Sequence, residues 1–215
     1  MKNIISVIFA IFTLVTAFSQ KSDEAKRILD EVSEKMNAYE DIYISFDYIF
    51  ENIDGGVSEE ISEGDAILKG DKYVINIFGI TRIFDGSKIY TIVHENEEVN
   101  ISDSEDDNLV LLTPSELINF HKSGYTYNLG TLENVNGKQI QYVILVPIDT
   151  ESEIASVKIG VDTKYKHIVS VRHIGKNDSE TTISIKNIEF NQSLNDTLFF
   201  FDENEYLNKR YTINR

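Results

Sequence analysis

The chain has 215 residues, of which 36 are acidic and 20 basic, and it contains no cysteine. The net charge of −16 disfavours nucleic acids and anionic lipid surfaces as direct partners, because both are recognised through positive charge. The absence of cysteine excludes disulfides and lipid attachment through a cysteine. The length suits one domain with a sizeable core.

The first residues resemble a secretion signal. Lys2 supplies a basic start, an uncharged apolar run extends from Ile4 to Phe18, and Ala17 and Ser19 are small residues at the positions read by a signal peptidase. As a helix this run rises only about 22 Å, less than the roughly 30 Å of a bilayer core. We therefore expect cleavage after Ser19, and the alternative is a retained membrane anchor. Residues 20–215 are predicted to form a single soluble domain outside the cytoplasm, in the periplasm if the source is Gram-negative.

A helix and a strand follow the signal. Apolar residues at helical spacing between Ser22 and Tyr39 predict a helix with one apolar face. At Tyr39 the period changes to two, which indicates a strand with a lining of large side chains. The helix face consists of Ala25, Ile28, Leu29, Val32 and Met36, and the strand face of Ile42, Ile44, Phe46, Tyr48 and Phe50.

The stretch from Gly64 to Ile101 alternates short apolar segments with tight turns. Turns this short join only neighbouring antiparallel strands, so the stretch predicts a meander, which curves. Some of its strands, such as 89–93, are apolar on both faces, which implies a covering layer on one side and leaves open either a ligand cavity or a solid core.

Residues 102–108 are mostly acidic or hydroxylated, but they lack the glycine and distal glutamate of a calcium loop, so we interpret them as a solvated loop. Thr113, Pro114 and Glu116 then begin a second helix with a capping box, which ends at Gly124.

Strands predominate again after this helix, at 125–132, 140–147, 154–162, 168–174 and 181–190, with a last short piece at 198–201 and a polar tail. The chain is thus predicted to be mainly β (α+β). We expect a single curved antiparallel sheet of about 10–11 strands, forming an unclosed half-barrel with two or three helices as a lid.

Motifs for catalysis are missing from the sequence. It contains no phosphate loop, nucleophile elbow or dinucleotide fingerprint, and its four histidines do not share metal-ligand spacing. We expect no enzymatic activity, cofactor or metal. A hydrolase that uses paired carboxylates stays open as an alternative, because acidic residues are abundant.

The motifs, in their order along the chain, resemble the LolA-type outer-membrane lipoprotein carrier proteins, particularly those of Bacteroidetes. The matching segments span nearly the whole chain after the signal: 25–50, 64–69, 83–90, 97–101, 112–115, and the closing Phe190 with 195–202. The family resemblance implies a half-open barrel with a helical lid over a hydrophobic cavity. It also implies a periplasmic chaperone that binds the acyl chains of lipoproteins, with an inner-membrane transporter and an outer-membrane receptor as partners.

Under this resemblance we expect a monomer that binds acylated lipoproteins or another lipid and binds no nucleic acid. The alternative is a LolA-like lipid-binding or sensor module with a different lipid. The predicted cavity lining is hydrophobic and comprises Phe46, Tyr48, Phe50, Ile75, Ile77, Tyr90, Ile92, Leu117 and Phe120.

One position departs from the family pattern. Where better-known members carry an arginine that fastens the lid, after the lysine that ends the Leu-x-x-Lys strand, this chain has Gly70. The latch is therefore missing, or Arg82 or Lys72 replaces it from another strand.

Overall fold

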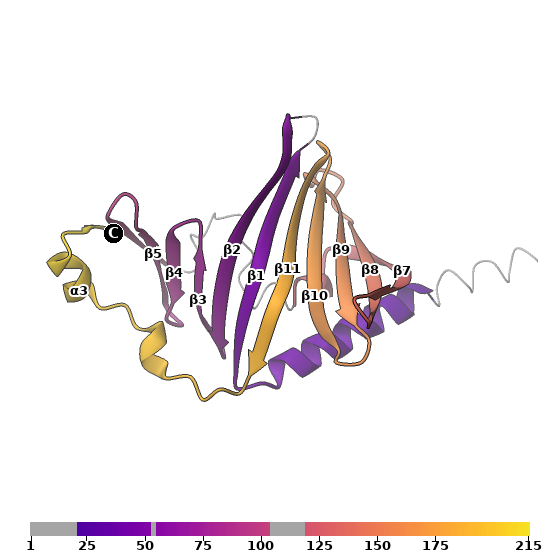
Figure 1. The fold of residues 1–215 in the computed structure, drawn as a ribbon, viewed down its shortest axis with the longest axis horizontal. Coiled ribbons are helices and arrows are strands. Elements are labelled where there is room, and N and C mark those ends of the chain that lie inside the picture. Colours follow the sequence, from indigo (N-terminus) through magenta and orange to yellow (C-terminus); the bar gives the residue numbers. More distant parts are fainter. Residues whose placement is uncertain (1–20, 53–54, 104–118) are drawn as a thin grey trace, which may run out of the picture.

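The computed structural model describes residues 21–52, 55–103 and 119–215, and within these ranges the fold is one large sheet (Figure 1). Its twelve strands follow one another in the order β12-β6-β5-β4-β3-β2-β1-β11-β10-β9-β8-β7, and the sheet is not closed. All neighbouring strands are antiparallel except β12 and β6, which are parallel. The strands are β1 (Asp41–Asn52), β2 (Val57–Lys69), β3 (Lys72–Ile77), β4 (Ile80–Phe84), β5 (Lys88–Val93), β6 (Glu98–Asp103), β7 (Tyr125–Val135), β8 (Lys138–Pro147), β9 (Ile154–Asp162), β10 (His167–Gly175), β11 (Ser179–Phe190) and β12 (Thr212–Asn214).

These strands confirm the predicted fold class and the meander. The turns between β2 and β6 lie where the sequence placed them, and the connection from β3 to β4 consists of Phe78 and Gly79. Both residues have positive φ, 54° and 70°, as a two-residue hairpin turn of matching twist requires. The chain is therefore held in a strict up-and-down order through this half of the sheet.

The N-terminal helix, residues 21–37, confirms the predicted amphipathic pattern. Its five predicted apolar residues are all buried, with exposed fractions from 0% to 7%. They form the larger core cluster together with buried residues from one face of β1, β2, β3, β8, β9 and β10. We call this covered face the inner face and the opposite one the outer face. Figure 1 shows the helix crossing the half of the sheet that ends in β7.

The C-terminal region differs from the prediction. Residues 198–201 are not a strand: a 3₁₀ helix, η3, spans Asp196–Phe199, followed by a short helix, α3 (Glu203–Asn208), and by β12. The physical reason is side-chain capping. Asn195 accepts a hydrogen bond from the Thr197 amide, and Asp202 accepts from the amides of the first turn of α3. This segment lies at the end of the sheet that carries β4 and β5 (Figure 1).

Three predicted segments fall wholly or partly outside the described residues: the signal peptide, residues 104–108 of the acidic loop, and the start of the second helix at Thr113. Ser102 and Asp103, the first residues of that predicted loop, belong to β6. Of the second helix, a 3₁₀ turn, η2 (Phe120–Lys122), is described, and Gly124 after it has a φ of 83°, as a helix stop requires. Among the helices that the structure describes, none is long and apolar enough to cross a membrane.

Candidate hydrophobic ligand-binding site

The inner face of the sheet presents an apolar surface built from cross-strand rows. Ile44 lies opposite Ala66, which lies opposite Ile75, and Ile42, Leu68 and Tyr73 form the next row. Directly paired residues in antiparallel strands point to the same face, so each row stacks large side chains side by side. All six residues are at most 7% exposed. The face is therefore continuous from β1 to β3.

Three residues of the predicted cavity lining lie within this surface. Phe46, Ile75 and Ile77 are 8%, 7% and 5% exposed and belong to the larger core cluster. Tyr48 is partly buried against the same cluster, and its ring meets that of Phe78 edge-on at 5.0 Å. Phe50 is half-buried further along β1, opposite Thr181.

Two other predicted lining residues, Tyr90 and Ile92, are on the outer face. Tyr90 pairs with Ile83, which pairs with Val74, whereas the inner-face residue Ile75 pairs with Arg82. Tyr90 and Ile92 are therefore separated from Phe46 and Ile75 by the thickness of the sheet. Leu117 lies outside the described residues, and for Phe120 only the backbone, in η2, is described.

Tyr90 instead belongs to a second core cluster, which the sequence analysis did not predict. Buried Phe199 and Phe201 of the C-terminal segment cover the outer face of β3 to β6 there, and the Tyr90 ring stacks on Phe201 at 4.5 Å. Its hydroxyl donates to Asp85 Oδ2 at 2.9 Å, and burial together with this bond raises the pKa of Tyr90 to about 12. Two features of the sequence could have predicted this cluster: strand 89–93 is apolar on both faces, and aromatic residues lie near the C-terminus.

The N-terminal helix covers the inner face over the half of the sheet that ends in β7 (Figure 1). Leu29, Val32 and Met36 project from the helix into the core and are at most 3% exposed. Beside the C-terminal end of the helix lies a cavity of about 240 Å³, bounded by the inner-face residues Ile42 and Leu68 together with Met36, Tyr39 and Gly70 among others. The other lining residues are polar, namely Asn37, Glu40, Asp41, Asp71 and Asn119, so this small space at the helix end is only partly apolar.

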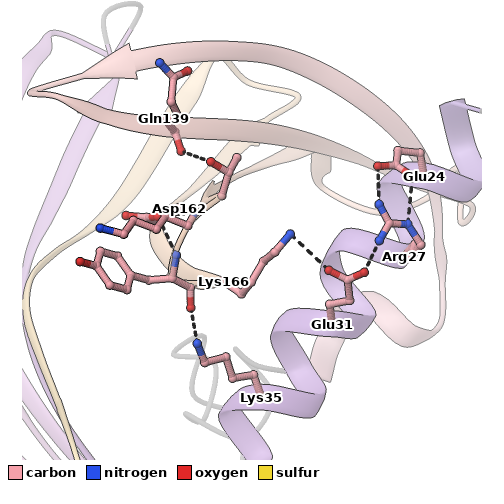
Figure 2. A network of polar contacts seen from close by, with 10 residues as sticks. Glu24, Arg27, Glu31, Lys35, Gln139, Asp162 and Lys166 are labelled. Atoms are coloured by element: carbon pink, nitrogen blue, oxygen red, sulfur yellow. Dashed lines mark hydrogen bonds and ion pairs between the residues drawn. The ribbon is translucent and has the colours of Figure 1, made fainter.

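Polar contacts fasten the helix to the turn between β9 and β10 (Figure 2). Lys166 Nζ lies 3.3 Å from Glu31 Oε2, and Lys35 Nζ donates to the Tyr165 carbonyl at 2.7 Å. On the helix itself Arg27 bonds to Glu24 and Glu31. Exposed ion pairs of this kind contribute about 0–1 kcal/mol each. The contacts orient the helix without locking it.

A second connection joins the helix to η2. The buried His121 places Nε2 3.3 Å from Asp30 Oδ1, and the Tyr127 hydroxyl donates to the His121 carbonyl. Burial lowers the pKa of His121, and the neighbouring Asp30 carboxylate only partly offsets this effect. The imidazole is therefore held largely neutral near neutral pH.

The register of the meander places the two candidate replacements for the missing latch, Arg82 and Lys72, on opposite faces of the sheet. Arg82 is on the inner face, in the row of Ile75, and is only 4% exposed. Lys72 precedes the inner-face residue Tyr73 and pairs with Lys69, so it is on the outer face. Only Arg82 is on the side of the sheet that the helix covers. Gly70 itself has a φ of 58°, in the left-handed region that favours glycine.

Among the described residues no group of three or more histidine, aspartate or glutamate side chains is arranged to hold a metal ion.

A family model described as outer membrane lipoprotein carrier protein LolA matches residues 82–202, more than half of the chain. No curated protein matches the sequence. Among solved structures, an uncharacterized conserved protein from Thermus thermophilus is similar in fold, with a TM-score of 0.60, 7% identity, and coverage of 88% of this chain and 98% of that one.

Two further solved structures have lower TM-scores. A LolA superfamily protein from Nitrosomonas europaea has a TM-score of 0.44 at 13% identity, and covers 83% of this chain and 98% of its own. The MucA/MucB complex of Pseudomonas aeruginosa contains a chain with a TM-score of 0.43 at 12% identity. The match covers 83% of the present chain and 61% of that chain.

Proposed function

Because this chain belongs to the LolA family of outer membrane lipoprotein carrier proteins, we propose that it is a non-enzymatic periplasmic carrier of acylated lipoproteins. Its inner face binds the acyl chains, and the protein delivers them toward the outer membrane. An inner-membrane transporter that loads it and an outer-membrane receptor that unloads it are the proposed partners, and the carrier works as a monomer.

The observation that carries the proposal is the apolar inner face under a single amphipathic helix. Each exposed CH₂ group costs about 0.8 kcal/mol in water, so an acylated anchor crosses an aqueous space only when it is shielded. The inner-face rows of β1 to β3 offer that shielding, and they are continuous, within one core cluster, with the surface that the helix residues Leu29, Val32 and Met36 cover. Acyl chain and helix therefore compete for one apolar surface.

This competition suggests how loading and release are balanced. Displacing the helix exposes its apolar residues, and an incoming acyl chain offsets that cost by burying the same strand surface. The cavity beside Met36 and Gly70 provides the first contact, because it adjoins Ile42 and Leu68 without any movement of the helix. The contacts from Lys35 and Lys166 are weak enough to break during loading.

The test is direct binding of an acylated peptide. The purified protein is titrated with a fluorescent diacylated peptide and with the same peptide lacking acyl chains, and lipids extracted from the protein as isolated are analysed by mass spectrometry. We expect saturable binding of the acylated peptide alone. A protein that takes up neither this peptide nor any other lipid contradicts the proposal, whereas selective uptake of a different lipid contradicts only the lipoprotein as ligand.

A further inference from the structure

We propose that the outer face of the sheet carries a second site, which binds a phosphate-bearing polar ligand. The site is a cavity of about 430 Å³ over β8 to β11 and β1, and it is distinct from the acyl-binding inner face. Its basic and hydroxyl-bearing side chains include Lys138, Lys158, Arg172, Ser170, Thr182 and Ser184.

The register places this cavity on the outer face. Thr182, Arg172 and Lys158 follow one another in one cross-strand row of β11, β10 and β9. The neighbouring row contains Val171 and Ile159, which are buried in the core under the helix. Because successive residues of a strand point to opposite faces, the cationic row points away from the inner face.

The charge of the cavity is opposite to that of the chain. Three of its thirteen lining residues are basic and none is acidic, although acidic residues outnumber basic ones by 36 to 20 in the sequence. Two carboxylates lie near the lining: Glu180 Oε2 is 3.2 Å from Arg172 Nη1, and Glu133 is close enough to help raise the pKa of Tyr142, which burial raises most. Such a local excess of positive charge attracts an anion by steering and by charge-assisted hydrogen bonds.

The floor of the cavity is shaped by Gly160. A Cβ at this position would lie 2.6 Å from Ser170 Oγ and 3.1 Å from Tyr142 Cε1, so glycine allows both side chains to lie close to the strand. Lys158 Nζ lies 3.8 Å from the centre of the Tyr142 ring, which keeps the ammonium group within the cavity rather than extended into solvent. Arg172 Nε donates to Thr182 Oγ1 at 3.1 Å, and this bond fixes the guanidinium beside the hydroxyls.

This donor set fits a phosphate group. A guanidinium and two ammonium groups neutralise its charge, while serine and threonine hydroxyls donate to its remaining oxygens. The apolar residues of the cavity, Ile49, Val135 and Val169, suit the carbon skeleton to which the phosphate is attached. Two sources share this chemistry: a soluble phosphorylated polyol and the headgroup of a phospholipid in a membrane.

The experiment compares these sources with a matched pair of lysine variants. Inorganic phosphate and glycerol 3-phosphate are titrated into the ¹⁵N-labelled protein, and vesicles of phosphatidylcholine with and without phosphatidylglycerol are tested by co-sedimentation. Lys158→Gln removes one cation of the site. Lys209→Gln is the control, because Lys209 also lies over a tyrosine ring, that of Tyr206, but just before β12, at the other end of the sheet.

We expect amide shifts at Ser170, Thr182 and Ser184, and an affinity about tenfold weaker in Lys158→Gln, the factor that corresponds to about 1.4 kcal/mol. Lys209→Gln should bind like the unaltered protein. Binding of glycerol 3-phosphate supports a soluble ligand, and binding only to vesicles that contain phosphatidylglycerol supports a lipid headgroup. The proposal is overturned if no probe binds or if both variants bind equally. Uptake of the acylated peptide should be unchanged in Lys158→Gln, so the two sites are tested independently.

Discussion

The ring of Phe46 occupies the space beside Gly64, the residue directly opposite it on β2, so that a Cβ at position 64 would lie 2.7 Å from Phe46 Cζ. Glycine at this position lets an aromatic ring lie over the neighbouring strand, where it covers backbone that would otherwise be bare. The pair thereby sets how closely the inner-face layer packs at the middle of β1.

Gly64→Ala is therefore expected to destabilise the fold. The added methyl group meets both the Phe46 ring and the Asn76 carbonyl, at 3.0 Å, and overpacking of this kind costs about 1–3 kcal/mol. Urea denaturation measures the change as a lower midpoint. Glu60→Ala, at an exposed position of the same strand, is the control and should change the free energy of unfolding by less than about 0.5 kcal/mol. An unaltered midpoint for Gly64→Ala would show that the ring moves aside without cost.

The two faces of the sheet should respond differently to the same substitution. Ile75→Thr and Ile92→Thr each place a hydroxyl at a buried position, the first on the inner face and the second on the outer face. We expect both to lower the free energy of unfolding by about 1–3 kcal/mol. Affinity for the acylated peptide should fall about fivefold in Ile75→Thr alone, because only its side chain contributes apolar surface to the ligand. Equal loss in both variants would argue against the inner face as the acyl site.

Arg82 is expected to control release of the ligand. It is a cation buried on the inner face, and a buried charged group that acts as a latch contributes about 1.5–3 kcal/mol through one hydrogen bond. Arg82→Gln should therefore raise the dissociation rate of the acylated peptide by about tenfold or more, measured by stopped-flow fluorescence. Lys72→Gln, on the outer face, should leave the rate unchanged. The reverse pattern would assign the latch to Lys72.

Glu31 is expected to influence how readily the helix leaves the sheet. Glu31→Lys replaces its attraction to Lys166 and Arg27 by repulsion, at a cost of about 0.5–1 kcal/mol. Amide hydrogen exchange in residues 21–37 and uptake of the acylated peptide should both become faster. Glu34→Lys makes the same charge change at an exposed position of the same helix and serves as the control. If amide hydrogen exchange is equally fast in the two variants, the contact between Glu31 and Lys166 does not help to hold the helix on the sheet.

Stability should fall as the solution is acidified below pH about 6.5. Burial lowers the pKa of His121, of His167 and of His173. The unfolded chain therefore binds protons at a pH where the folded chain does not, so folding stability is fully present above the unfolded pKa of about 6.5 and is lost as pH falls toward the folded values. Urea denaturation at pH 7.5, 6.5 and 5.5 should show a declining free energy of unfolding. In His173→Asn the free energy of unfolding should decline less steeply with falling pH. A free energy of unfolding that stays constant from pH 7.5 to 5.5 would contradict the inference that the folded protein buries these histidines in their neutral form.

Local pattern was enough to predict most of the fold. The helix face that includes Leu29 and the strand face that includes Phe46 followed from periods of 3.6 and 2. The hairpin turns followed from turn-forming residues such as Gly79 and Asn96, because these are properties of neighbouring residues. Strand order within the meander followed too, since turns such as that at Phe78 and Gly79 are too short to join any other strands.

The tertiary structure decided what covers each face. The pattern of strand 89–93 indicated two apolar faces, but only the register assigned Tyr90 and Ile92 to the outer one, because a shift by a single residue exchanges the two faces of a strand. The register of β9 to β11 places Lys158 and Arg172 in one row with Thr182, whereas the cover formed by Phe199 and Phe201 brings together segments that are distant in sequence. Such pairings depend on long-range packing, which leaves no periodic signal in the chain.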